Sequence, residues 1–221
     1  MCGRMNIHDH AGIQALLDNL GLMVPMERFS ARHNVAPAAE IFAAFGQVDH
    51  DLAAMEWGIL PPWAKPGKFK SPLINARAET VWEKPSFKSL IRSNRAIIPI
   101  NGFYEWKRSG KTKTTYYIHS SRGAALALAA LYQTSKEGIL QCCVITTSSN
   151  GTMLPIHNRM PVILDPENMQ GWLTSGNTDH LNSLLKPAAD HVLRVSRVSD
   201  YVNNARNEGS KCMQAFEQSA D

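Results

Sequence analysis

Short apolar runs of strand-like composition recur along this chain and constrain its fold more than any other feature. Clear examples are residues 41–45, 95–100, 125–131 and 140–147. The helical patterns between such runs do not alternate with them regularly, as they do in doubly wound parallel sheets. The sequence therefore predicts an α+β fold, with a curved, barrel-like, mostly antiparallel β core and peripheral helices.

Start and stop signals predict where the helices lie. Asp9 precedes apolar residues at helical spacing and Gly21 follows them, which indicates a first helix over about residues 9–20. Asp165-Pro166-Glu167 combines an N-cap, a proline at the first helical position and an early acid, so another helix begins there. A further helical pattern covers residues 178–185.

Other local signals predict a hairpin, a loop and a kinked helix. Ser109-Gly110-Lys111 is typical of the tip of a β-hairpin whose return strand covers residues 115–119. Residues 34–37 are predicted to form a loop. A helix is predicted over about residues 79–92, with Pro85 kinking or dividing it.

Length and composition favour a single domain over residues 1–221, with a loose tail from about residue 210. The chain is 44% hydrophobic and 19% charged, and no apolar run approaches the roughly 18 to 20 residues of a membrane span. Because the N-terminus also lacks the features of a secretory signal, we expect a cytoplasmic, monomeric protein without membrane contact. The net charge of +4 permits nucleic-acid binding without demonstrating it.

The four cysteines are Cys2, Cys142, Cys143 and Cys212, and their spacing matches neither a CxxC nor a Cys/His metal-binding pattern. We therefore expect no metal site, no disulfide framework and no cofactor. Cys142 and Cys143 lie inside an apolar run and are predicted to be core or strand-edge thiols.

Cys2 becomes an unusual reactive group if Met1 is removed, and the small Cys2 side chain permits that removal. The mature chain then begins with a thiol and a free α-amine on one carbon. Such a 1,2-aminothiol attacks an aldehyde through nitrogen to give an imine, and then through sulfur to close a thiazolidine ring. The α-amine has a reference pKa of about 7.7 to 8.0, well below that of lysine, so more of it is neutral near pH 7. Position alone also fits an ordinary residue after the start codon.

Glu105 lies between aromatic residues in the predicted strand Phe103-Tyr104-Glu105-Trp106. Strand alternation puts Phe103 and Glu105 on the same face. Burial beside a phenylalanine raises the pKa of a carboxyl group toward the range used in general acid and base catalysis. An ion pair with Arg92 or Arg95 is the alternative interpretation.

Two pairs of residues, each with a spacing of two, join a neutral polar side chain to a cation. Asn75 is paired with Arg77, and His157 with Arg159, and extended backbone would point each pair to one side. His157 also lies in a polar interval just before an apolar strand, where proteins often place ligand-binding side chains. A structural or solvent-exposed histidine is the alternative.

Trp63 lies in a proline-rich loop that also carries Lys65, Lys68 and Lys70. A tryptophan held among lysines is suited to stacking on a nucleic-acid base. Burial of Trp63 beneath its own loop is the alternative.

Together these motifs resemble the SOS response-associated peptidase family, whose members process abasic sites and crosslink themselves to such sites in single-stranded DNA. The resembling segments run in order through most of the chain: Met1-Cys2-Gly3-Arg4, Asn34-Val35-Ala36-Pro37, Trp57-Gly58, Leu73-Ile74-Asn75-Ala76-Arg77-Ala78-Glu79-Thr80, Gly102-Phe103-Tyr104-Glu105-Trp106-Lys107 and Ile156-His157-Asn158-Arg159-Met160-Pro161. The resemblance implies a single α+β domain with a barrel-like β core.

The resemblance also implies a set of catalytic residues. By position, Cys2 is the crosslinking residue, and Asn75, Glu105 and His157 complete the active site. His157 is suited to proton transfer while the sugar ring opens. Glu105 is suited to proton transfer with the α-amine and the departing hydroxyl during imine formation. Asn75 is suited to fixing the Cys2 backbone or the sugar. A lyase activity and a thiol autopeptidase activity are further implications.

The same matching implies that Arg4, Arg77 and Arg159 hold phosphates beside the lesion and that Trp63 stacks near it. The implied partner is single-stranded DNA with abasic sites, which would bring the protein to the nucleoid, and replication-fork proteins are further candidate partners. This chain departs from many relatives around residues 66–70, where its loop is longer.

Three other functions remain open. A cysteine at position 2 followed by glycine also begins class II glutamine amidotransferases, although this chain is too short for their second domain. Cys2, His157 and Asn75 are the residue types of a cysteine peptidase. The third is a binding module for single-stranded or modified DNA, in which Cys2 is incidental.

Overall fold

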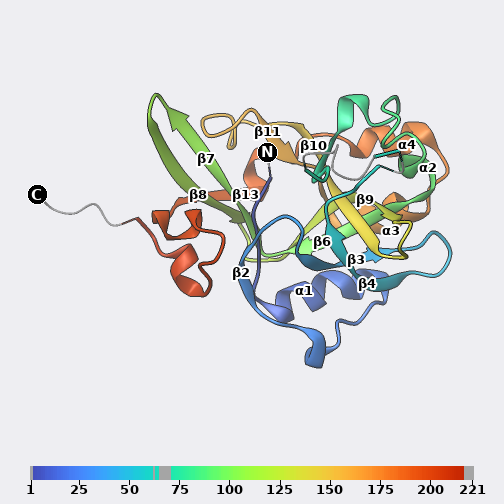
Figure 1. The fold of residues 1–221 in the computed structure, drawn as a ribbon, viewed down its shortest axis with the longest axis horizontal. Helices are drawn as coiled ribbons and strands as arrows, with labels where there is room; N and C mark the ends of the chain where they lie inside the picture. The colour runs from blue at the N-terminus through green and yellow to red at the C-terminus, as the bar shows by residue number, and fades with distance from the viewer. Residues whose placement is uncertain (1, 62, 65–70, 217–221) are drawn as a thin grey trace, which may run out of the picture.

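Five strands close into a barrel at the centre of the computed structural model, which describes residues 2–61, 63–64 and 71–216 (Figure 1). In order around the barrel they are β3 (Glu40–Phe45), β4 (Asp51–Trp57), β10 (Leu140–Ser148), β9 (Leu126–Thr134) and β6 (Arg95–Ile100). β6 pairs with β3 and closes the ring. The pairing of β4 with β10 is parallel, and the others are antiparallel. The predicted mostly antiparallel, barrel-like α+β fold is thus confirmed.

The barrel strands carry apolar residues on both faces because both faces are buried. In β6, Ile98 packs into the barrel interior with Met55, whereas Ile97 packs into the outer layer with Ile13 and Trp172 from the helices. Such strands appear in the sequence as continuous apolar runs, which is why the predicted range 95–100 matches β6.

The neighbouring thiols of β10 follow the same alternation. Cys142 belongs to the interior cluster and Cys143 to the outer one, and both are free and fully buried. The prediction that these cysteines are core residues is confirmed.

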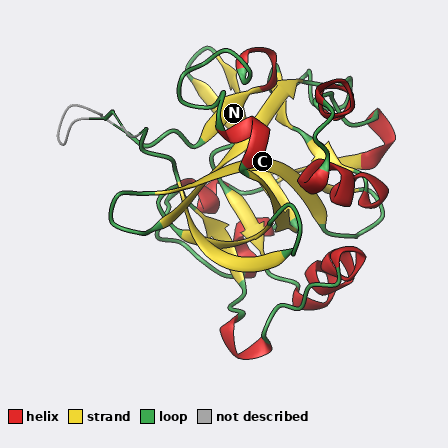
Figure 2. Cartoon of the chain, turned by 90° about the vertical axis from the view of Figure 1, so that its right-hand side faces the viewer, coloured by secondary structure: helices red, strands yellow, loops and turns green. Residues whose placement is uncertain are grey.

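The α-helices lie around the barrel, as Figure 2 shows. They are α1 (His10–Leu17), α2 (Leu90–Ser93), α3 (Pro166–Thr174) and α4 (Thr178–Leu184). The short 3-10 helices are η1 (Asp18–Leu20), η2 (Met26–Arg28), η3 (Ala78–Thr80), η4 (Asp190–Val192), η5 (Asp200–Asn203) and η6 (Ser210–Met213). Among the described residues, no helix has both the length and the apolar character that a membrane span needs.

The predicted first helix is confirmed as α1 continued by η1. The Asp9 side chain caps α1 by accepting from the Gly12 backbone, and Gly21 ends η1 in the left-handed region, with φ of 66°. Pro166 is the first residue of α3, as predicted. These boundaries are set by local chemistry, which explains why the sequence locates them.

A second sheet crosses one end of the barrel. Its order is β13 (Leu193–Arg197), β8 (Thr112–Ser120), β7 (Gly102–Ser109), β1 (Met5–Ile7) and β2 (Arg32–Val35). β7 and β8 form the predicted hairpin, which projects as a long arm in Figure 1. The Tyr104 N–H donates to the Arg4 carbonyl at 3.0 Å, so the chain just before β1 also lies along β7. The N-terminal segment is therefore held where the two sheets meet.

Two short strands flank the end of β10. They are β5 (Asn75–Arg77) and β11 (Arg159–Pro161), whereas the short strand β12 (Ile163–Leu164) pairs with β9. β5 runs parallel to β10, with Thr146 opposite Arg77, and β11 runs antiparallel to it, with Ser148 opposite Arg159. Segments distant in sequence thus meet at one end of a barrel strand.

Three local predictions differ from the structure. Residues 79–92 do not form one helix: η3 is followed by turns, and only α2 is α-helical. In the segment 34–37, predicted as a loop, the first two residues belong to β2. Beyond residue 210, where a loose tail was expected, Cys212 is buried and Ala215 forms a bridge with Val198.

Candidate active site

Cys2 lies fully buried against the interior cluster of the barrel, among residues such as Met5 and Phe103. Burial raises the pKa of its thiol, and the nearby Glu105 carboxylate raises that pKa further. The thiol is therefore protonated near neutral pH. Such a group does not act as a ready thiolate nucleophile.

Asn75 contacts the backbone of Cys2 directly. Its Nδ2 donates to the Cys2 carbonyl at 3.0 Å. β5 supplies this side chain because Ala76 faces the outer core, which turns Asn75 and Arg77 to the other side of the strand. The Asn75 Oδ1 atom is buried and has no hydrogen-bond partner among the described residues, so one acceptor remains at this position.

Glu105 lies on β7 with only 2% of its surface exposed. The predicted alternation holds, because Phe103 packs in the cluster that contains Cys2, whereas Tyr104 and Trp106 pack in a separate cluster on the other face. The carboxylate thus shares the face of β7 that looks toward Cys2.

Arg95, the alternative ion-pair partner of Glu105, is bound elsewhere. Its guanidinium donates to five carbonyl oxygens, which belong to Ile91, Arg92, Trp172, Leu173 and Ser175. An arginine side chain has five N–H groups, and these carbonyls accept from them at the ends of α2 and α3. Arg95 therefore joins two helices to the barrel.

His157 lies on the turn that leads into β11. The Arg159 backbone N–H donates to its Nδ1 atom at 3.0 Å, and the His157 backbone N–H donates to the Met153 carbonyl at 3.0 Å. The same Nδ1 atom lies 3.2 Å from the Arg159 carbonyl oxygen, so the backbone of Arg159 holds one edge of the ring.

The three predicted phosphate-binding arginines have different environments. Arg77 is exposed at the end of β5. Arg4 donates to Asn34 Oδ1 at 2.7 Å and to the Val202 carbonyl at 3.1 Å. Arg159 forms a bidentate ion pair with Glu79, with N···O distances of 2.5 and 2.9 Å. Arg77 therefore presents its charge to solvent, whereas the other two are bound within the protein.

Trp63 is 53% exposed, so the alternative of a buried Trp63 is wrong. The loop is anchored at Leu60, whose N–H donates to Gln141 at 3.2 Å and whose carbonyl accepts from Gln133 at 2.6 Å. Lys65, Lys68 and Lys70 lie outside the described residues. The exposed indole ring of Trp63 is available for stacking.

Sequence reasoning did not identify Glu79 and Asn34 as partners of the candidate arginines. Asn34 is buried and binds Arg4, and it also donates to the carbonyls of Val202, Asn204 and Asn207. The position of Asn34 within the motif at residues 34–37 was the signal available in the sequence. The Glu79–Arg159 pair joins positions 80 residues apart, and no local pattern predicts such a contact.

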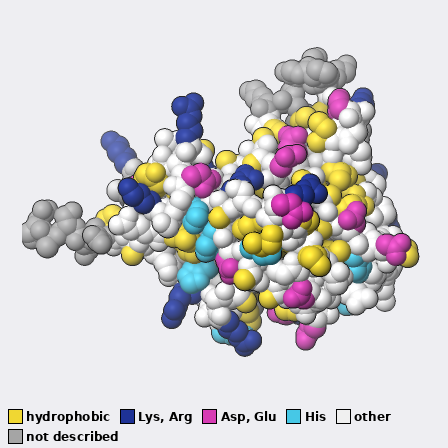
Figure 3. Space-filling model, turned by 90° about the horizontal axis from the view of Figure 1, so that it is seen from below, with side chains coloured by type: hydrophobic (Ala, Val, Ile, Leu, Met, Phe, Trp, Pro, Cys, Tyr) yellow, Lys and Arg dark blue, Asp and Glu magenta, His cyan; other side chains and the backbone are white. Residues whose placement is uncertain are grey.

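On the face shown in Figure 3, charged side chains are scattered among uncharged ones without one large charged patch, and Asp and Glu lie mainly on the right-hand part. Within the described part of the chain, no group of three or more His, Cys, Asp or Glu residues is arranged to hold a metal ion.

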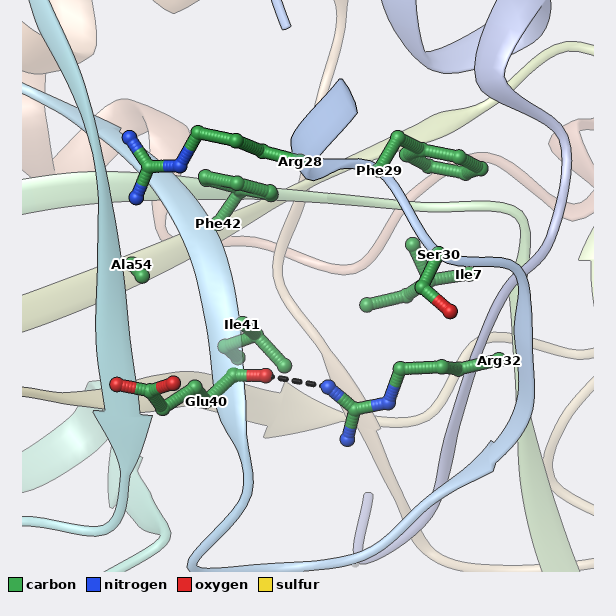
Figure 4. Close-up of a pocket in the computed structure, with 9 residues that line it drawn as sticks. All are labelled: Ile7, Arg28, Phe29, Ser30, Arg32, Glu40, Ile41, Phe42 and Ala54. Atoms are coloured by element: carbon green, nitrogen blue, oxygen red, sulfur yellow. Dashed lines mark hydrogen bonds between the residues drawn. The ribbon is translucent and has the colours of Figure 1, made fainter. Parts of the chain in front are cut away.

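A cavity of about 330 Å³ opens beside β2 and β3, and Figure 4 shows the side chains around it. Arg28 lies over the Phe42 ring at 5.5 Å, and Arg32 donates to the Glu40 carbonyl at 2.5 Å. None of the predicted catalytic or DNA-binding residues lines this cavity. It is separate from the candidate active site.

A comparison with known protein families shows the family to which this chain belongs. The family described as SOS response associated peptidase (SRAP) matches residues 1–205. The chain belongs to the SRAP family. The family resemblance predicted from the sequence motifs is thereby confirmed.

Three curated relatives of this SRAP chain are named abasic site processing proteins. YoqW of Bacillus subtilis is 38% identical over 97% of this chain and 100% of its own length. YedK of Escherichia coli is 30% identical over 83% of this chain and 84% of its own length. HMCES of Xenopus tropicalis is 33% identical over 75% of this chain and 57% of its own length.

A solved structure supports the SRAP fold. A protein from Bacteroides thetaiotaomicron superposes with a TM-score of 0.82 and covers 96% of this chain and 100% of its own. Its sequence identity is 24%, so it supports the fold alone.

Proposed function

We propose that this chain processes abasic sites in single-stranded DNA by linking Cys2 covalently to the lesion. The proposal brings to this chain the substrate that its relatives' names mention. Its main support is the environment of Cys2, whose carbonyl is held by Asn75 at 3.0 Å and whose thiol pKa is raised by burial and by Glu105. Removal of Met1 is part of the proposal, because only a free α-amine on Cys2 completes the aminothiol.

The α-amine attacks first. An abasic deoxyribose must open to its aldehyde, and His157 transfers protons during that opening. The Cys2 nitrogen then forms a bond to the aldehyde carbon, and the carbonyl oxygen takes up a proton. Loss of this oxygen as water gives an imine. Glu105 accepts a proton from the attacking amine and returns one to the departing hydroxyl.

The thiol closes the product. Its sulfur forms a bond to the imine carbon, and the thiol proton moves to the nitrogen, which gives a thiazolidine without any change in oxidation state. This order agrees with the environment of Cys2, since burial raises the pKa of the thiol and keeps it protonated near neutral pH. A peptidase mechanism needs a thiolate at that pH, so this environment favours the aldehyde trap. Strand cleavage by β-elimination needs only the imine, so a lyase activity accompanies the trap.

The proposed DNA contacts are assigned from the solvent exposure of the side chains. Arg77 meets a backbone phosphate first because it is exposed, and Trp63 stacks on a base beside the lesion. Arg4 and Arg159 supply further positive charge. Contacts with phosphates carry no sequence information, as binding to randomly placed damage requires.

The test uses protein whose mass shows that Met1 is absent, mixed with a single strand that carries one abasic site. We expect a heat-stable adduct on a denaturing gel. Cys2→Ala should lose this adduct but retain β-elimination, because it keeps the α-amine and loses the sulfur. Cys143→Ala is the matched control, since it removes a buried thiol from the outer core, and it should retain the adduct.

Two outcomes contradict the proposal. A wild-type protein without Met1 that forms no heat-stable adduct would exclude covalent trapping. An undiminished adduct with Cys2→Ala would show that the sulfur of Cys2 does not close the product.

A further inference from the structure

Glu79 binds the guanidinium of Arg159 in the manner that a phosphate would bind it. Arg159 Nη1 lies 2.5 Å from Glu79 Oε1, and Arg159 Nη2 lies 2.9 Å from Glu79 Oε2. Arginine recognises carboxylates and phosphates through the same two-pronged geometry. One face of a guanidinium cannot hold both groups at once.

Arg159 is fixed within the protein, whereas Glu79 is not. Arg159 Nη2 also donates to the Thr146 carbonyl at 2.6 Å and to Thr146 Oγ1 at 3.2 Å, which ties the guanidinium to β10. The side chain of Arg159 is 13% exposed, and that of Glu79 is 50% exposed. Glu79 is therefore the partner that can swing into water and uncover the arginine.

The position of the pair connects it with the candidate active site. Glu79 follows Asn75 and Arg77 in the same segment, and Arg159 follows His157. β5 and β11 bring both segments to the end of β10. A strand that reaches Cys2 and Arg77 would have its backbone phosphates near this pair.

We propose that Glu79 is an internal competitor that occupies Arg159 and lowers the affinity of the protein for the phosphate backbone of single-stranded DNA. The inference rests on the proposed function for its ligand. A bound phosphate must displace the carboxylate, and the displaced negative charge remains close to the strand. Intact DNA is then held weakly and released, while an abasic site is retained by the covalent bond.

The experiment measures reversible binding of an intact, labelled single strand by fluorescence anisotropy at low salt. Glu79→Gln should tighten binding by roughly three- to fivefold, the size expected for an ion pair that is partly exposed. Glu83→Gln is the matched control, because Glu83 is an exposed acid in the same part of the chain and has the same charge change. We expect a smaller gain with this control, which reports the general effect of charge.

A second pair of variants tests whether the effect passes through Arg159. In an Arg159→Ala background, Glu79→Gln should tighten binding no more than Glu83→Gln does, because the competed site is gone. Glu79→Ala serves as a second substitution, and thermal unfolding verifies that each variant is folded.

Three results would overturn the inference. They are a Glu79→Gln affinity no greater than that of Glu83→Gln, an unreduced Glu79→Gln effect in the Arg159→Ala background, and no binding of the intact strand by any of these proteins. Adduct formation by the wild-type protein on abasic DNA is measured separately. Loss of that adduct alone would reject the covalent chemistry and leave the Glu79 inference standing on the binding data.

Discussion

Replacement of Asn75 tests how the backbone of Cys2 is held during the proposed reaction. Asn75 Nδ2 donates to the Cys2 carbonyl at 3.0 Å, and Asn75 Oδ1 is a buried acceptor with no partner among the described residues. Asn75→Ala removes both groups. Asn75→Asp keeps an oxygen acceptor in the same place and loses the donor. The two variants therefore separate the donor from the acceptor.

The expected magnitude follows from this one hydrogen bond. A bond between neutral groups contributes about 0.5 to 1.5 kcal/mol in net terms. The held carbonyl orients both reacting groups of Cys2, so its loss in Asn75→Ala should slow adduct formation roughly two- to twelvefold, given that about 1.4 kcal/mol corresponds to a factor of ten. Asn75→Asp should be slower still, because its carboxylate oxygens repel the Cys2 carbonyl oxygen.

The assay is single-turnover adduct formation on denaturing gels, with protein in large excess over an abasic single strand so that strand binding does not limit the rate. Asn182→Ala is the matched control, because it also removes one side-chain hydrogen bond, from Trp82 Nε1 at 2.7 Å, on α4. This control should react at the wild-type rate. An Asn75→Ala protein as fast as the wild type, or an Asn75→Asp protein faster than Asn75→Ala, would refute the role of the donor.

The other predictions concern stability and its dependence on pH. Arg95→Lys should lower the free energy of unfolding in urea by about 2 to 4 kcal/mol, because three lysine N–H groups cannot satisfy five carbonyls; a loss below about 0.5 kcal/mol would contradict this. Burial raises the pKa of the Cys143 thiol to about 12. Above pH 9 the unfolded chain therefore loses the thiol proton while the folded chain keeps it. The free energy of unfolding then falls by at most about 1.4 kcal/mol per pH unit. Cys143→Ala should show a shallower fall between pH 9 and 10.5, whereas Val144→Ala, a buried control without a titratable group, should keep the wild-type slope.

The barrel and the hairpin were predictable because their signals are local. In the run 95–100 every residue after Arg95 is apolar, and a strand buried on both faces explains that pattern in so short a segment. The two-residue turn at Gly110 and Lys111 carries its own signal, and Gly110 has the positive φ of 57° that such turns need. The first helix was located by its cap at Asp9 for the same reason.

The helix predicted over residues 79–92 failed because tertiary contacts outweigh its periodic pattern. Trp82 donates to Asn182 on α4 at 2.7 Å, and Phe87 and Val81 pack into the outer core from a series of turns. The barrel buries these side chains in that arrangement, and Pro85 already limits a continuous helix. The parallel pairing of β4 with β10 likewise depends on a long-range contact that neither segment specifies alone.

For the candidate site, the family resemblance implied Cys2, Asn75, Glu105 and His157, and the structure places Asn75 and Glu105 near Cys2. The sequence did not predict the partners of the arginines. The resemblance implied that Arg159 holds a phosphate, but in the structure Glu79 binds it from a segment 80 residues away. A charge identified from sequence carries no information about which opposite charge the fold will place beside it.

Cys2 and Arg159 are both held by other groups of the protein, Cys2 by Asn75 and Arg159 by Glu79. The thiol of Cys2 is buried and protonated, so it does not react with the aldehyde before the amine does. Arg159 is paired with the Glu79 carboxylate, which by our inference weakens its binding to phosphate. In the proposed mechanism, retention of the strand then depends on the two bonds formed at the aldehyde carbon rather than on electrostatic affinity. Weak reversible binding and a stable covalent product are therefore compatible in one site, because the reversible binding involves the Arg159 guanidinium and the covalent product involves the amine and thiol of Cys2.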